Sequence, residues 1–582
     1  MPTRLSFPVM LLLLTSVFAE GRQQAKTPGA REPDLCVVPS SSRPTLPARL
    51  MEGMGRSSFP ITTTSPEAQA FFNQGVAQLH SFWVRESERS FMQAAQLDPD
   101  AAMAYWGIAI SAAGDYRPAF QLMRNRSRLG QAPAEPDSGR ARALEAIKKA
   151  MELRSRVSER ERLYIEALSA RRDPESKDAT GEYTRGLRKL VAAYPDDLEA
   201  KSILALAIQN GYEPVTREPR EGTMESLALL REILSRDPDH IGAHHYMIHG
   251  CEGGKRPQDA WQSCKRYPEL VPNIPHALHM PGHIYAQSGR LEDAAHSFAS
   301  AALTELGYMA ADATYGSGHY GHNHHFLIHT LGLQGRYREA MSRTSELLRI
   351  KENPRERASV DGQSTHRQGW FCLMKTLVRF EKWDEILDGQ TLPLHDKPRE
   401  AAWYHWARGL AHSFTGNSAE AEASLSEMRK SLETLKDSSK SIPPQLDAAR
   451  VELEGHIEAR TGKREKGLEL LSKAARMENE LIYTEPPAYP RPVLEALART
   501  ALALGNFKEA ESAYRKAFEL EPGSGRALWG IAQALYGAGE KNEADKMFAQ
   551  FARVWVTADS DLPEMKKAQE STRPSTARTR SR

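Results

Sequence analysis

Histidines are concentrated in one part of this sequence, at spacings that could bring their rings together. Thirteen of the nineteen histidines lie between residues 240 and 329. Three pairs are spaced four residues apart, so the members of each pair would share one helix face. The pairs are His245 and His249, His279 and His283, and His325 and His329. The first two pairs are 34 residues apart, which is the length of one helix–turn–helix repeat. We therefore expect equivalent helices to stack the same pair side by side.

Metal binding is the most specific hypothesis for such histidine pairs. Histidines four residues apart on a helix have Cβ atoms about 5–6 Å apart, so two ring nitrogens can reach one ion at about 2.0–2.1 Å. Neutral imidazoles without a thiolate suit zinc, copper(II), nickel or non-haem iron. Glu252 follows His249 by three residues on the same face and could serve as a carboxylate ligand or a general base. The sequence predicts a divalent transition metal without identifying it.

The elements that would position these residues are helices. From residue 60 onward, apolar residues recur at spacings of three and four, and short turns contain Gly, Asp-Pro or Glu-Pro. No segment sustains the alternation of a half-buried strand. We expect an all-α protein without strands.

Small and aromatic residues repeat near both ends of this helical region. Phe71, Gly75, Phe91 and Ala94 precede Asp98-Pro99, and Gly505, Ala510, Tyr514 and Ala517 precede Glu521-Pro522. This pattern resembles tetratricopeptide repeats, in which small residues let two helices pack closely and a proline follows the second. The resemblance covers most of residues 60–555. It implies a superhelical solenoid of antiparallel helix pairs.

The same resemblance sorts the histidines by their places in the repeat. The second, fifth, ninth and twelfth places of a first helix face the concave groove, and they are occupied here by His245, His249, Glu252, His276, His279, His283, His322, His325 and His329. His244 and His324 take the fourth place, which packs between helices. His240, His296 and His319 fall at helix starts, outer faces or loops and are expected in solvent. The groove should therefore contain eight histidines and one glutamate.

Three histidine runs support a closer resemblance. They are HYMIH at residues 245–249, HALHMPGHIY at 276–285 and HNHHFL at 322–327. These runs are similar to those of a family of exported bacterial tetratricopeptide proteins. That resemblance implies architecture and the location of a site, and it carries over no activity.

An insertion separates the second and third histidine repeats. Twelve extra residues fall around Tyr308–Gly318. The segment could act as a lid over a ligand, or it could be an ordinary surface insertion.

Other functions compete with metal binding. The histidines could form a satisfied polar network with Tyr246, Tyr285 and Tyr320. A groove without metal could bind a peptide or a small acidic ligand with pH-dependent affinity. A protein-interaction scaffold would need no histidines. A metal-dependent hydrolase or oxidase is the remaining alternative, although the usual catalytic sequence motifs are missing, so catalysis stays undecided.

The ends of the chain differ from the repeats in composition. Residues 1–19 are typical of a signal peptide, with an apolar stretch from Leu5 to Ala19 that is short for a membrane span. The sequence predicts a disordered linker over 20–58, helical repeats over 59–240, histidine-rich repeats over 241–350, further repeats over 351–555 and a disordered basic tail over 556–582. We expect an exported protein without a membrane segment after cleavage.

Charge and cysteine content narrow the partners and the chemistry. The chain has 77 basic and 75 acidic residues, which gives no case for nucleic acid as a partner, whereas a protein or peptide could bind the repeat groove. Cys251 and Cys264 could form a disulfide in an oxidising compartment, or they could be small buried side chains.

Overall fold

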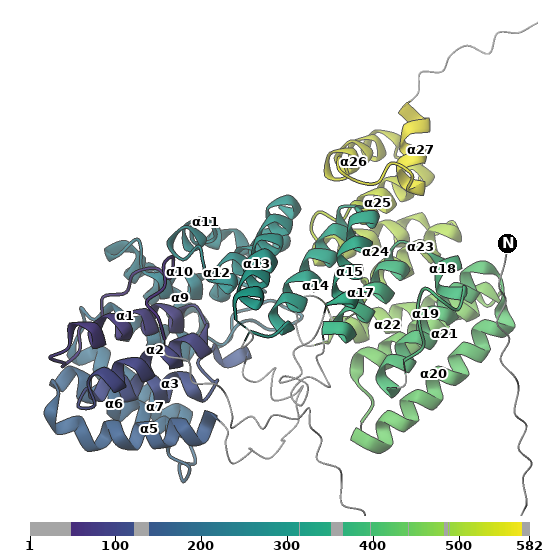
Figure 1. Cartoon of the computed structure of the whole chain (residues 1–582). Coiled ribbons are helices and arrows are strands. Elements are labelled where there is room, and N and C mark those ends of the chain that lie inside the picture. Colours follow the sequence, from purple (N-terminus) through teal and green to yellow (C-terminus); the bar gives the residue numbers. More distant parts are fainter. Residues whose placement is uncertain are drawn as a thin grey trace, which may run out of the picture.

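The computed structural model describes residues 48–121, 139–312, 315–350, 365–395, 397–439, 441–481, 487 and 489–572. These residues form an all-α fold whose helices follow one another around a superhelix (Figure 1). The described part of the chain contains no strand, only an isolated bridge between Tyr212 and Pro219. The predicted all-α fold is confirmed. In these same residues, every helix is too short or too polar to cross a bilayer.

The N-terminal half consists of helices up to the end of the histidine-rich region. They are α1 (Pro66–His80), α2 (Val84–Leu97), α3 (Ala102–Ala112), α5 (Gly139–Leu153), α6 (Glu159–Arg172), α7 (Ala179–Ala193), α8 (Leu198–Ile208), α9 (Thr223–Arg236), α10 (Ile241–Cys251), α11 (Trp261–Leu270), α12 (Pro275–Gln287), α13 (Leu291–Ala311), α14 (Gly318–Leu333) and α15 (Tyr337–Arg349). Short 3-10 turns cover Arg154–Arg156 and Pro257–Ala260.

The C-terminal half continues the same organisation. Its helices are α17 (Thr365–Arg379), α18 (Trp383–Leu387), α19 (Pro398–Thr415), α20 (Ser418–Ser439), α21 (Pro444–Arg460), α22 (Arg464–Asn479), α23 (Val493–Ala503), α24 (Phe507–Leu520), α25 (Gly525–Gly537), α26 (Lys541–Val554) and α27 (Pro563–Thr572).

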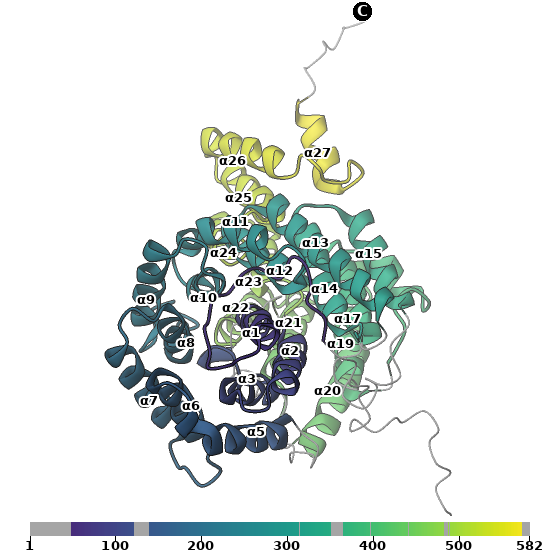
Figure 2. The ribbon, with the colours of Figure 1, turned by 60° about the vertical axis from the view of Figure 1, so that its left-hand side comes forward.

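Consecutive helices pack in pairs that stack on one another. The pairs α8–α9, α10–α11 and α12–α13 are examples, and α10 also contacts α12 in the next pair. Close packing depends on small residues: a Cβ added to Gly282 of α12 would lie 2.5 Å from the ring of Phe298 of α13. The helices from α5 to α15 curve around α1 and α2, which lie inside the curve (Figure 2). The tetratricopeptide-type superhelix predicted from the sequence is therefore present.

The end of the predicted N-terminal linker is folded, so the prediction of disorder is wrong for residues 48–58. Ala48 and Met54 are buried. Met51 donates its backbone N–H to Gln74 of α1 at 2.7 Å, and Asn273 donates its side-chain amide to the Glu52 carbonyl at 2.9 Å. These partners come from α1 and from the turn between α11 and α12, so the local composition could not reveal them. The predicted signal peptide and the linker up to residue 47 lie outside the described residues.

The predicted disordered tail also begins with structure. Helix α27 covers Pro563–Thr572, and Leu562 is buried beside Phe551 and Trp555. Trp555 donates its indole N–H to the Leu333 carbonyl at 2.8 Å, and Asp559 donates its backbone N–H to the Gly335 carbonyl at 3.0 Å. The prediction failed because these contacts join the C-terminal end to α14 across the superhelix. Residues 573–582 lie outside the described residues.

A partly buried ion pair anchors the segment that follows α3. Asp115 accepts two hydrogen bonds from Arg172 of α6, at 2.7 and 2.8 Å, and lies 3.2 Å from Arg171. Burial would raise the pKa of Asp115, but the charges and hydrogen bonds of the two arginines lower it to about 2. The next two residues are Tyr116 and Arg117, which face the histidine-rich helices. The ion pair therefore fixes the position of these two residues beside the histidine-rich helices.

Replacing Asp115 tests this anchor. We expect Asp115→Asn to lower the free energy of unfolding by about 1–2 kcal/mol at pH 7, because 32% of the carboxylate side chain is exposed and solvent screens the pair. The folded-state pKa is depressed, so the stabilisation is present above the unfolded pKa of about 4 and is lost as the pH falls through about 2. Urea denaturation from pH 7 to pH 2 measures it. A difference between the two proteins that is independent of pH would contradict the assignment.

Candidate metal centre

Three of the predicted histidines converge where α10 contacts α12. His245 and His249 come from α10, and His276 comes from the first turn of α12. One ring nitrogen from each lies within 4.8 Å of the other two. His245 and His249 are buried and His276 is partly buried. The repeat spacing thus brings together a group with the size of a metal site.

The Nδ1 atoms of two rings are held by fixed partners, and for His245 the partner determines which nitrogen carries the proton. The His245 Nδ1 lies 2.5 Å from the backbone carbonyl of His80, and the His249 Nδ1 lies 2.8 Å from the Glu252 carboxylate. A backbone carbonyl only accepts, so the His245 Nδ1 donates and its Nε2 keeps its lone pair. The His249 Nδ1 also lies 3.2 Å from the side-chain nitrogen of Gln121. The His249 Nε2 is buried and has no hydrogen-bond partner among the described residues. This is the arrangement by which proteins orient histidine ligands of metals.

The spacing and protonation of the rings also suit an ion. The Nε2 atoms of His245 and His276 are 3.2 Å apart. Two ligands of a tetrahedral ion, each at about 2.0–2.1 Å, would be separated by about 3.3 Å. Burial lowers the pKa of His245 and of His276 well below the usual value, and neighbouring histidines lower both further. Both rings are therefore neutral at pH 7, as metal ligands must be.

Glu252 links the first two histidine repeats. Its Oε2 contacts His249, and its Oε1 lies 3.4 Å from the Nδ1 of His283. The His283 Nε2 is 2.7 Å from the Nε2 of His279, which is a hydrogen-bond distance. Glu252 is buried just after α10 and orients histidines of both repeats. The structure places it behind the ligand nitrogens, whereas the predicted roles as a direct ligand or a general base stay untested.

The third histidine repeat does not join this group. His322 is exposed, with its ring centroid 4.9 Å from that of His279. His325 lies 3.2 Å from Lys375, and His329 lies 3.6 Å from Glu521. The insertion explains the difference, because α13 extends to Ala311 and the next pair packs toward the C-terminal helices. His322 therefore stays next to the second repeat, whereas His325 and His329 contact residues of the C-terminal half.

The remaining histidines test the sorting by repeat position. His244 contacts Ser263 of α11 at 3.0 Å, and His324 contacts Glu346 of α15 at 3.2 Å, so both pack between helices as predicted. His296 and His319 are exposed, also as predicted. His240 was expected in solvent, but only 7% of it is exposed. That prediction was wrong because α1 packs against the start of α10.

The N-terminal helix pair covers the histidines, which therefore do not face an open groove. The turn between α1 and α2 places the Phe82 ring centroid 4.4 Å from that of His245 and 5.4 Å from that of His249. Phe82 has a positive φ of 52°, which is unfavourable for a bulky residue and is found where surrounding packing enforces it. The Arg117 guanidinium lies 4.8 Å above the same ring. The centre is thus enclosed by an element distant in sequence.

The insertion also contributes to this cover. The ring centroids of Tyr308 and Tyr315 lie 4.9 and 6.0 Å from that of Trp83, which follows Phe82 in the turn. The prediction that the insertion acts as a lid stays a prediction, since residues 313 and 314 lie outside the described residues.

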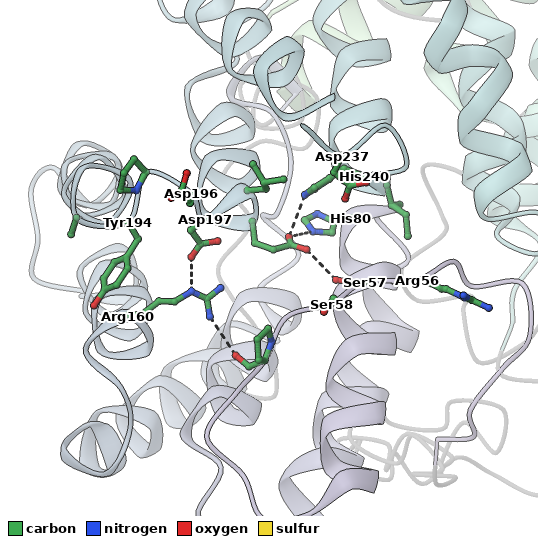
Figure 3. Close-up of a pocket in the computed structure, with 16 residues that line it drawn as sticks. Arg56, Ser57, Ser58, His80, Arg160, Tyr194, Asp196, Asp197, Asp237 and His240 are labelled. Carbon is green, nitrogen blue, oxygen red and sulfur yellow. Dashed lines mark hydrogen bonds and ion pairs between the residues drawn. The ribbon is translucent and has the colours of Figure 1, made fainter. Parts of the chain in front are cut away.

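A second group with metal-like spacing was missed by the sequence analysis. His80 at the end of α1, Glu199 in α8 and His240 before α10 each place a ligand atom within 4.8 Å of the others. The His80 Nε2 is 2.6 Å from Glu199, and its Nδ1 is 2.8 Å from the Tyr246 hydroxyl. The group lies at the floor of a pocket (Figure 3). These residues come from three distant helices, and no local pattern in the sequence marks them.

Hydrogen bonding argues against a metal at this second group. The His240 Nδ1 accepts the backbone N–H of Ala243 at 3.1 Å and so caps α10. A neutral imidazole carries one proton, so the proton is on Nε2, the atom that faces Glu199 at 3.8 Å. An ion bound there would require the ring to give up the cap. Burial would raise the pKa of Glu199, but His80 and His240 lower it to about 2, so the carboxylate is ionised.

The cysteines of the histidine-rich region are buried as free thiols. Cys251 and Cys264 do not form the disulfide that we considered. Burial raises the pKa of Cys251 to about 12, so the thiol is protonated and unreactive.

Comparison with known proteins adds to the repeat assignment. Residues 501–553, from the last turn of α23 through α26, match the family described as tetratricopeptide repeat. These residues form tetratricopeptide repeats. No curated protein matches the chain. Arrays of such repeats present extended surfaces that bind other proteins.

Several solved structures resemble the chain loosely. The human IFIT1 dimer with m7Gppp-AAAA has 12% identity and a TM-score of 0.32, covering 86% of this chain and 92% of that one. Yeast Tom70 has 14% identity and a TM-score of 0.21, with 87% and 88% covered. The P58(IPK) tetratricopeptide domain has 13% identity and a TM-score of 0.22, with 82% and 99% covered.

The role of His240 as a cap can be tested through stability. Asparagine is a favourable N-cap residue, whereas alanine costs about 1 kcal/mol at this position. We expect His240→Asn to leave the melting temperature close to that of the original protein and His240→Ala to lower the free energy of unfolding by about 1 kcal/mol. Thermal and urea unfolding measure both. Equal losses in the two variants would show that the Nδ1 does not cap α10, and the argument against a metal would fall.

Proposed function

We propose that the protein is a tetratricopeptide-type solenoid that holds a divalent transition-metal ion between His245, His249 and His276. The observation that carries the proposal is the orientation of the rings. The His245 Nδ1 donates to a fixed carbonyl and the His249 Nδ1 faces the Glu252 carboxylate, and the buried His249 Nε2 has no hydrogen-bond partner among the described residues. One nitrogen of each of the three rings lies within 4.8 Å of the others. The His245 Nε2 lies 3.2 Å from the His276 Nε2, whereas a buried imidazole nitrogen without a partner, such as the His249 Nε2, is costly unless a cation occupies the space beside it.

The donor set narrows the choice of ion. Three neutral imidazoles suit zinc, copper(II), nickel or iron(II) better than calcium or magnesium, which prefer oxygen ligands. Three protein ligands also leave a position for a water or an exogenous ligand, as in histidine sites that bind zinc. The buried carboxylate of Glu252 offsets part of the charge of the ion.

The repeat fold supports a second role as a protein-interaction scaffold. Solenoids of stacked helix pairs bind partners on their extended surfaces. Because α1 and α2 lie inside the curve beside the histidines (Figure 2), the partner surface that we propose lies elsewhere on the superhelix. Export is also part of the proposal, and it rests on the composition of residues 1–19.

Elemental analysis tests the metal site. We expect untagged full-length protein, dialysed and free of affinity-tag histidines, to retain about one transition-metal ion per chain. The double variant His245→Ala/His249→Ala should lose it, because two of the three ligands are gone. His296→Ala is the matched control, since this exposed histidine lies on the neighbouring helix α13. Metal-free protein that also takes up no zinc, copper, nickel or iron would refute the proposal.

A variant that replaces the carboxylate behind His249 tests the orientation of the ligand. We expect Glu252→Gln to weaken metal affinity by about 10- to 100-fold, because a neutral amide orients the imidazole less well and makes it less basic. Competition with a chromophoric chelator measures the affinity. Glu292→Gln is the control, since the side chain of Glu292 on α13 is 72% exposed. Unchanged affinity in Glu252→Gln would mean that the carboxylate does not support the ligand.

A further inference from the structure

A pocket of about 630 Å³ opens over the group formed by His80, Glu199 and His240. Its walls are the folded segment at residues 56–60, the start of α6, the turn between α7 and α8, and the turn between α9 and α10 (Figure 3). Its volume is in the range of sites that bind small molecules and short peptide segments. No role in the metal site proposed above uses this pocket.

The floor of the pocket presents an acceptor beside a donor. The Glu199 carboxylate is ionised, accepts from the His80 Nε2 at 2.6 Å and from the Ser57 hydroxyl at 3.0 Å, and its side chain is 12% exposed. The His240 Nε2 carries a proton, because the Nδ1 accepts from Ala243, yet this Nε2 has no hydrogen-bond partner within the described part of the chain. The residue is only 7% exposed. A buried donor without a partner costs roughly 1–3 kcal/mol, which a ligand carbonyl would recover.

The charged rim favours a cationic group. The pocket is lined by two arginines and four carboxylates, namely Arg56, Arg160, Asp196, Asp197, Glu199 and Asp237. Arg160 is neutralised by Asp197 at 2.7 Å, and Asp196 is paired with Arg236 outside the pocket at 2.8 Å. With His80, which lies 2.6 Å from Glu199, and His240 both neutral, Glu199 and Asp237 outweigh the remaining Arg56. An anionic ligand would meet this excess of negative charge at the floor.

We propose that this pocket binds the free amino terminus of a peptide, with the ammonium group at Glu199 and the first carbonyl at the His240 Nε2. An ammonium group has three donors and pairs with a carboxylate through charge-assisted hydrogen bonds. In a peptide, the first carbonyl follows the ammonium group by two bonds, so one residue supplies an acceptor for the His240 Nε2 and a cationic donor for Glu199. Capture of a terminal amine is a known mode of peptide recognition.

A neighbouring cavity leaves room for the peptide residues that follow the first one. A second cavity of about 550 Å³ shares Arg56, Ser57, Ser58 and Asp237 with the first. The peptide would therefore continue along the folded segment at residues 55–58. A simple amine would satisfy Glu199 but leave the His240 donor without a partner. A metal ion is disfavoured by the same proton on His240.

Calorimetry with defined peptides tests the proposal on the full chain in the presence of a chelator, so that the outcome does not depend on the metal centre. The probes are trialanine amide, the same peptide with an acetylated amino terminus, and alaninamide. We expect trialanine amide to bind and acetylation to weaken binding by roughly tenfold or more, because it removes the charge. Equal binding of the acetylated peptide would overturn the proposal. Alaninamide binding as tightly as trialanine amide would show that the pocket takes amino-acid derivatives instead of peptides.

Variants assign the two contacts separately. Glu199→Gln should weaken trialanine amide by roughly tenfold or more, since it removes the carboxylate charge. His240→Asn retains a helix cap but removes the Nε2 donor, so it should weaken the peptide while the melting temperature stays unchanged. Asp196→Asn is the matched control, because this side chain is 88% exposed and paired outside the pocket. Full affinity in folded His240→Asn would overturn the role of the donor, and zinc bound in place of peptide would overturn the ligand class.

Discussion

The backbone carbonyl of His80 is the contact on which the centre of the molecule depends. It accepts the proton of the His245 Nδ1 and so determines which nitrogen of that ring is available. It also ties the end of α1 to α10, two elements separated by 165 residues. The side chain of the same residue points the other way, to Glu199 and Tyr246. One residue thus connects the enclosed histidine centre with the open pocket.

The backbone partners of two imidazoles explain why two groups with similar spacing differ in their chemistry. In both groups an imidazole Nδ1 is held by the backbone. At His245 the partner is a carbonyl, which takes the proton and leaves the Nε2 lone pair. At His240 the partner is an N–H, which donates to the Nδ1 lone pair, so the proton of the ring is on Nε2. The type of backbone partner therefore separates a candidate ligand from a hydrogen-bond donor.

The sequence was sufficient for the fold and for part of the centre, because both follow from regular spacing. Helical periodicity and small residues such as Gly282 specify the stacked pairs, and the 34-residue repeat brings His245 and His249 next to α12. The same reasoning failed beyond the insertion, since α13 is longer than a standard repeat helix and shifts His325 and His329 away. His80 and Glu199 could not be found by this route, because neither the curvature of the superhelix nor the position of α1 inside it is encoded in a local pattern.

The contacts of the C-terminal end with α14 change how the molecule should respond as a whole. In an open solenoid each repeat touches only its neighbours, and the ends can fray without disturbing the middle. Here the indole of Trp555 is bonded to Leu333, and Asp559 is bonded to Gly335, across more than two hundred residues of chain. Loss of the last helices would remove a support from the histidine-rich region itself. The C-terminal end is therefore coupled to the middle of the array. Unfolding of this array is more cooperative than that of a linear stack of repeats.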